Sequence, residues 1–303
     1  MPPQEEPEQR RPLELSCGLP PGPDFVDLAV LAEQCGYRRI WIFDSAALYE
    51  DPLVHLALAA RDTARIGLGT AVLIPAQRSL MTMASGIATV ARLAPGRLRA
   101  CFGTGFTAMA VTGRKPMRLD DFFDYVGALR GLLAGETVEF DATKLRMMHG
   151  PGLATDRPVD VELWLSVFGP RGNARAAEVA DGIIGPPHAT LPSATMISGS
   201  VLDPGEDDRS PRVREAVGPW RAVAWHGAYW SGGERLIDAM PGGAEWRESL
   251  ESLSTPDERH LLTFEGHVTH LPERDRRLLD QPEAGGAGRG EITGAPEALS
   301  LIH

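Results

Sequence analysis

The segment RIWIFDSAALYEDPLVHLALAARDTARIGLGTAVL, residues 39–73, decides the fold class. It opens with an apolar run that ends at Asp44 and predicts a buried strand. Asp51 and Pro52 then supply a helix cap and a first-turn proline, and apolar residues follow at helical spacing. Residues 66–73 form a second apolar run, which predicts another strand. Strand, helix and strand in this order predict a parallel βαβ unit.

The same unit recurs along the chain at a regular interval. Further strands are predicted at residues 13–17 and 97–102, so that four strands begin near residues 13, 39, 66 and 97. Their starts are 26, 27 and 31 residues apart, which is typical of parallel strands joined by crossover helices.

The next part of the chain decides between an open doubly wound sheet and a closed barrel. Three more strands are predicted, at residues 161–167, 182–184 and 194–201. Seven strands in sequence favour the (β/α)₈ TIM-barrel-like fold over the doubly wound sheet.

We expect a flexible polar leader over residues 1–12 and a single barrel domain over residues 13–303. The domain is well supported over residues 13–185, and residues 186–303 have an irregular pattern. A helix that starts at Ser210 is expected to be interrupted at Pro219, because proline removes a helical hydrogen bond and clashes with the preceding turn.

The composition excludes several classes of protein. The 303 residues carry 30 Lys and Arg against 41 Asp and Glu, a formal charge of −11, which argues against a nucleic-acid partner. The longest uncharged apolar run is too short to span a membrane. Three unpaired cysteines and an N-terminus without an apolar signal core favour a cytoplasmic location.

A glycine-rich loop follows the fourth predicted strand. Its sequence, Gly103-Thr104-Gly105-Phe106-Thr107-Ala108, matches the G-x-G-x-x-A pattern of dinucleotide-binding folds. That pattern requires a helix that anchors pyrophosphate, and here Gly113 and Pro116 interrupt the residues that follow. A nicotinamide-dependent dehydrogenase is therefore the weaker interpretation. A strand end at which a flat ligand approaches the backbone is favoured.

A second glycine-rich loop, Phe168-Gly169-Pro170-Arg171-Gly172-Asn173, lies between a predicted strand and a predicted helix. Free N–H groups at the helix start and the Arg171 charge form a candidate phosphate cradle. The alternative is an ordinary βα turn whose arginine is solvated, and the residues alone leave both interpretations open.

Other polar residues give weaker signals. Asp44 and Thr70 lie at or near predicted strand ends, where a barrel builds its active site, but a turn and a strand position explain them equally well. His267 belongs to a histidine cluster with no metal-binding spacing, so we expect no metal. Asp44 and His267 are the only catalytic candidates, and neither is assigned a role.

Several segments together resemble the luciferase-like superfamily of flavin- or deazaflavin-dependent oxidoreductases. They follow the order found in that family, covering residues 13–185 well and the rest thinly. The segments are residues 32–37, 40–44, 51–52, 63–70, 94–97, 103–107, 132–136, 168–172, 180–182, 260–262 and 265–267.

The resemblance implies a TIM barrel, often a homodimer, that binds FMN or the deazaflavin coenzyme F-420 at the carboxyl ends of its strands. Thr70 and Ala71 would lie beside the ring system, where the family often has a strained or cis peptide. The loop Gly103-Thr104-Gly105 would flank the cofactor. The loop Gly169-Pro170-Arg171-Gly172 would hold its phosphate.

The main functional prediction is a reduced-FMN-dependent monooxygenase acting on a small organic substrate. Its partner would be a flavin reductase or a supply of reduced deazaflavin. The alternatives are an F-420-dependent hydride-transfer oxidoreductase and a non-catalytic or degenerate barrel.

Two departures from the family pattern motivate the last alternative. Ser45 stands where many members have a histidine after the aspartate, and we expect the last β/α unit of the barrel to be missing or replaced. Residues 260–268, or a partner chain, could fill the gap in the barrel.

Overall fold

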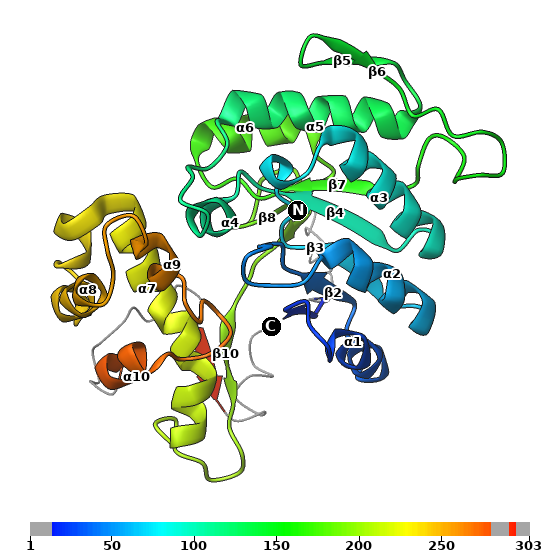
Figure 1. The fold of residues 1–303 in the computed structure, drawn as a ribbon. Helices are drawn as coiled ribbons and strands as arrows, with labels where there is room; N and C mark the ends of the chain where they lie inside the picture. The colour runs from blue at the N-terminus through cyan, green and yellow to red at the C-terminus, as the bar shows by residue number, and fades with distance from the viewer. Residues whose placement is uncertain (1–13, 280–290, 295–303) are drawn as a thin grey trace, which may run out of the picture.

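The computed structural model describes residues 14–279 and 291–294. Seven strands form one sheet in the order β1, β2, β3, β4, β7, β8 and β9, and all their pairings are parallel. The strands are β1 (Ser16–Leu19), β2 (Arg39–Ile42), β3 (Gly67–Thr70), β4 (Leu98–Phe102), β7 (Glu162–Leu165), β8 (Gly182–Ile184) and β9 (Ser193–Ala194). The sheet curls into a half-barrel, which confirms the predicted TIM-barrel-like fold (Figure 1).

Helices cover the outer face of this sheet (Figure 1). They are α1 (Phe25–Gln34), α2 (Pro52–Asp62), α3 (Leu80–Leu93), α5 (Leu119–Ala134) and α6 (Pro170–Val179). Asp51 caps α2 as predicted, since its carboxylate accepts hydrogen bonds from the N–H groups of Leu53 and Val54. The hairpin of β5 (Val138–Phe140) and β6 (Thr143–Leu145) projects from this layer.

Strand side chains alternate between the helical layer and the barrel interior. Ile40 and Ile42 join the core beneath the helices, whereas Trp41 and Trp164 pack together inside the barrel with ring centroids 5.8 Å apart. Gly69 leaves room for this interior, because a Cβ atom there would lie 2.4 Å from the Trp41 ring. The barrel interior at these residues is therefore a packed core.

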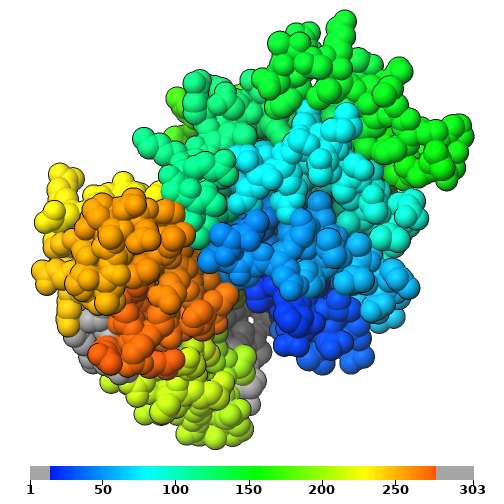
Figure 2. All heavy atoms as spheres, in the orientation of Figure 1, coloured from blue at the N-terminus to red at the C-terminus, as the bar shows by residue number. Residues whose placement is uncertain are grey.

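The chain then leaves the sheet and builds a second layer beside the half-barrel (Figures 1 and 2). This layer holds α7 (Pro211–Ile237), α8 (Gly243–Ser252), α9 (Arg259–Thr263) and α10 (Glu273–Leu279). A separate parallel pair is formed by β10 (Ser198–Val201) and β11 (Glu291–Gly294), and β10 contacts α7. Trp225 and Trp246 are fully buried in a small hydrophobic core of their own. No helix in the described ranges is long and apolar enough to be a membrane span.

Three details of the sequence prediction are wrong in this region. Residues 194–201 are not one strand, since β9 pairs with the main sheet and β10 with β11. Residues 260–268 do not close the barrel, because they form α9 and a turn. Helix α7 continues through Pro219 and departs from helical geometry at Gly233 instead. Packing of α7 against its neighbours outweighs the lost hydrogen bond at Pro219.

The described residues contain no ladder between β1 and β9, so the sheet stays open at this point. The predicted leader, residues 1–12, lies outside the described residues.

Candidate functional site

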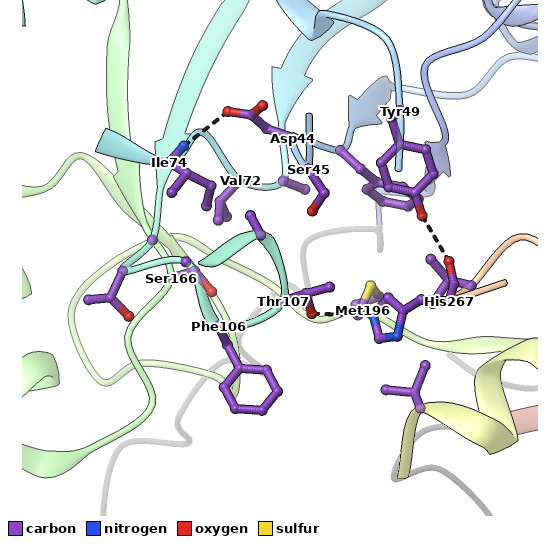
Figure 3. A pocket seen from close by; sticks show the side chains of 18 of the residues that line it. Asp44, Ser45, Tyr49, Val72, Ile74, Phe106, Thr107, Ser166, Met196 and His267 are labelled. Atoms are coloured by element: carbon purple, nitrogen blue, oxygen red, sulfur yellow. Dashed lines mark hydrogen bonds between the residues drawn. The ribbon is translucent and has the colours of Figure 1, made fainter. Parts of the chain in front are cut away.

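A cavity of about 360 Å³ opens at the carboxyl ends of β2, β3, β4 and β7, facing the second layer (Figure 3). Both the size and the position are typical of a ligand site in a barrel. Its walls are mostly apolar. Residues from the half-barrel side and from the second layer contribute, including Phe43, Asp44, Ser45, Tyr49, Ala71, Val72, Ile74, Gly103, Thr104, Gly105, Phe106, Thr107, Ser166, Phe168, Met196, Trp220, Val223 and His267.

Asp44 is buried in the cavity wall directly after β2. Its Oδ2 atom accepts hydrogen bonds from the Ile74 N–H at 3.1 Å and from Arg78 at 2.5 Å. Burial raises the pKa of Asp44, and the Arg78 charge opposes that rise. Its Oδ1 atom is buried and has no hydrogen-bond partner among the described residues. Asp44 thus combines a fixed ion pair with one unused acceptor at the cavity.

Thr70 and Ala71 lie at the end of β3 but face different surroundings. The Thr70 hydroxyl donates to the Cys101 carbonyl at 2.9 Å and accepts from the Cys101 N–H at 2.8 Å. Thr70 therefore ties β3 to β4 and does not line the cavity. Ala71 does line it, and its peptide bond to Val72 is cis, at the position where the resemblance places a strained or cis peptide.

The loop Gly103-Thr104-Gly105 forms the floor between β4 and the short helix α4 (Phe106–Ala110). A Cβ atom on Gly103 would lie 2.7 Å from Val72, and Gly105 has φ +88°. Glycine is needed at both positions, for close approach and for a left-handed conformation respectively. A helix does open at Phe106, but it ends after five residues.

A second pocket adjoins the cavity and shares Thr104, Ser166 and Phe168 with it. Helix α6 starts at this pocket with Gly169 as its N-cap and Pro170 as its first residue. The N–H groups of Arg171 and Gly172 occupy the first turn, where a helix has no internal acceptors for them. No carboxylate side chain of the described residues lines this pocket. Its donors suit an anion such as a phosphate group.

His267 reaches the cavity from the opposite side, after α9. Its Nε2 atom lies 3.2 Å from the Thr107 hydroxyl, and its backbone carbonyl accepts from the Tyr49 hydroxyl at 3.2 Å (Figure 3). Burial lowers the pKa of His267 to about 3, and the neighbouring His226 adds to the decrease. His267 is therefore neutral at pH 7.

Behind His267 lies a buried chain of polar side chains. The Nδ1 atom of His267 is 2.9 Å from Nδ1 of His226 on α7. The Nε2 atom of His226 lies 3.6 Å from Oδ2 of Asp275 on α10, a polar contact that is longer than a hydrogen bond. Both His226 and Asp275 are at most 1% exposed. Asp275, His226 and His267 together form the relay.

The structure brings most of the predicted site residues to one place. Asp44, Ala71, His267 and the loop 103–105 line the cavity, and the loop 169–172 lines the adjoining pocket. The sequence analysis assigned no role to Thr107, Tyr49, His226 or Asp275. No spacing signal connects His226 to His267, 41 residues later.

The fold and the cavity together define a barrel protein with a ligand site at the carboxyl ends of its strands. The model of the luciferase-like monooxygenase family matches residues 6–196, more than half of the chain. The chain belongs to this luciferase-like family of oxidoreductases.

Two relatives by sequence cover the chain to different extents. An F-420-dependent glucose-6-phosphate dehydrogenase from Beutenbergia cavernae is 31% identical over 298 residues, covering 84% of this chain and 88% of the relative. A 5,10-methylenetetrahydromethanopterin reductase from Methanolobus tindarius is 32% identical over 162 residues, covering 52% of this chain and 48% of the reductase. The chain thus matches about half of that reductase.

A solved structure supports the fold. The coenzyme F-420 dependent tetrahydromethanopterin reductase from Methanopyrus kandleri matches with a TM-score of 0.59 at 18% identity, and 93% of each chain is covered. The dehydrogenase relative is named for F-420, the cofactor that the sequence analysis placed second.

Proposed function

We propose that this protein is an F-420-dependent oxidoreductase that transfers a hydride between the deazaflavin and a small organic substrate. The observation that carries the proposal is the relative that matches 84% of the chain at 31% identity and is named as F-420-dependent. The cavity at the strand ends supports it, because a site of this kind places a cofactor beside a substrate.

The residues of the site fit such a cofactor. The pocket at the start of α6 offers the Arg171 guanidinium, first-turn N–H groups and the hydroxyls of Thr104 and Ser166 to a phosphate. It joins the cavity through shared residues, so one elongated molecule can occupy both. A flat ring would lie against the Ala71 backbone and the loop Gly103-Thr104-Gly105, where side chains are absent or small. When bound, F-420 supplies a carbon centre that accepts or donates a hydride.

The test is a titration of the purified protein with oxidised F-420 and, separately, with FMN, followed by cofactor fluorescence. We expect F-420 to bind at micromolar concentration and at least about tenfold more tightly than FMN, a difference of about 1.4 kcal/mol. Reduced F-420 should compete for the same site.

Two other results would redirect the assignment. Preference for FMN over F-420 would favour a reduced-FMN-dependent monooxygenase, which the description of the family model also fits. Binding of neither cofactor would contradict the proposal and favour a non-catalytic barrel.

A further inference from the structure

We propose that the relay of Asp275, His226 and His267 makes Nε2 of His267 the proton acceptor for a substrate hydroxyl during alcohol oxidation. This inference rests on the proposed function and assigns a proton-transfer site to His267, which lines the same cavity as Ser45. His267 is the catalytic residue of this proposal, and His226 and Asp275 are positioning residues that act through it.

The hydrogen-bond pattern fixes where the protons lie. Asp275 accepts at Oδ1 from the Trp246 indole at 2.8 Å and from Arg274 at 2.9 Å, which favours its ionised form. Burial opposes ionisation of Asp275, but His226 and Arg274 outweigh it and lower its pKa. The carboxylate therefore attracts the proton of His226 to Nε2.

The proton on Nε2 of His226 determines the proton positions on His267. With its proton on Nε2, neutral His226 offers the lone pair of Nδ1 to His267. His267 must then carry its proton on Nδ1, because the two Nδ1 atoms are 2.9 Å apart and one must donate. The lone pair of His267 is left on Nε2, which accepts from the Thr107 hydroxyl and faces the cavity.

The surroundings keep His267 neutral until substrate arrives. Thr107 of α4, His226 of α7, the Phe264 ring and the Tyr49 hydroxyl contact it, and Asp275 and Arg274 of α10 act through His226. Asp44, paired with Arg78, lines the same cavity. A neutral imidazole is the form that accepts a proton.

The proposed step balances as follows. The substrate hydroxyl would first replace the Thr107 hydroxyl as the hydrogen-bond donor to Nε2 of His267. The substrate O–H bond would then break and its proton would move to Nε2, while the adjacent C–H bond would break and its hydride would pass to oxidised F-420. The carbon–oxygen bond becomes a carbonyl. His267 then carries a positive charge, which the Asp275 carboxylate stabilises through His226.

The first test reads the histidine tautomers directly, by NMR of protein labelled with ¹⁵N-histidine and free of cofactor. We expect His267 in the neutral Nδ1–H form between about pH 6 and about pH 8, because this whole range lies above its lowered pKa. Asp275→Asn should reverse the placement of the ring protons in both histidines. The amide N–H that this substitution introduces can donate to Nε2 of His226, so that His226 carries its own proton on Nδ1. His267 would then change to the Nε2–H form. An Nε2–H form in the unchanged protein, or no change in Asp275→Asn, would overturn the proposal.

The second test measures turnover of isopropanol and cyclohexanol with oxidised F-420. His267→Gln should lower kcat by about 10²-fold or more, while the F-420 dissociation constant changes by less than about twofold. Asp275→Asn should lower kcat with little change in KM. The control His260→Gln, on α9 and outside the cavity, should match the unchanged protein.

The outcomes separate this inference from the proposed function. Failure to bind F-420 contradicts the proposed function. The NMR test uses protein without cofactor, so it tests the proton placement on His267 whether or not F-420 binds. Binding of F-420 without oxidation of either alcohol, or full activity of His267→Gln, contradicts the assignment of His267 alone.

Discussion

Asp44 depends on Arg78 for its charged form. The Arg78 side chain is 11% exposed, and its guanidinium bridges Asp44 at 2.5 Å and Asp51 at 2.9 Å. Arg78→Met leaves the buried Asp44 carboxylate without its partner, so we expect a loss of about 3 kcal/mol in the free energy of unfolding at pH 8. Urea unfolding measures this loss.

The loss should depend on pH with a definite sign. Burial already raises the pKa of Asp44, and removal of Arg78 raises it further. The folded variant then favours a protonated Asp44, so the destabilisation is largest above the folded pKa and shrinks as pH falls toward the ordinary Asp value of about 4. Arg61→Met, at an exposed position on α2, is the control and should show neither effect. An equal loss at pH 5 and pH 8 would contradict this role of Arg78.

At the level of elements, the start of α6 is expected to determine cofactor affinity. Arg171→Gln removes a positive charge from the pocket but keeps the helix and its free N–H groups. We expect the F-420 dissociation constant to rise about tenfold, because a charge-assisted hydrogen bond to phosphate is worth about 1.5 kcal/mol. The titration should also lose part of its dependence on salt concentration.

Arg175 provides a matched control on the same helix. Its guanidinium pairs with Asp120 at 2.7 Å and lies over the Phe123 ring, outside the pocket. Arg175→Gln should leave F-420 affinity unchanged within about twofold. An equal weakening in both variants would mean that net charge, rather than the pocket at α6, governs binding.

The elements also show which parts of this protein the sequence could predict. Strands β2 and β3 were predictable because each is fully buried and the next α-helix along the chain, α2 or α3, begins after a side-chain cap, Asp51 or Ser79. Helix α7 was mispredicted because packing against α8, α10 and β10 carries it through Pro219, and local propensity contains no such contact. The relay was unpredictable for the same reason: His226, His267 and Asp275 meet only after α7 and α10 have packed together.

At the level of the whole molecule, charge should select against anionic substrates. The chain has a formal charge of −11, and the cavity wall contains Asp44 but no lysine or arginine from the described residues. An anion would therefore enter an unfavourable field and find no counter-charge. With F-420 bound, we expect cyclohexyl phosphate to bind at least about tenfold more weakly than cyclohexanol, which shares its ring.

A substitution in the cavity tests whether the missing counter-charge is the cause. Val223 lines the cavity from α7, so Val223→Arg places a guanidinium where an anionic substrate would lie. We expect this variant to bind cyclohexyl phosphate about tenfold more tightly than the unchanged protein does, by a charge-assisted hydrogen bond. Val223→Met, similar in length but uncharged, should show no gain. Competition against cyclohexanol turnover gives both affinities. Tight binding of cyclohexyl phosphate to the unchanged protein would contradict the argument, because a cation would then have to reach the cavity.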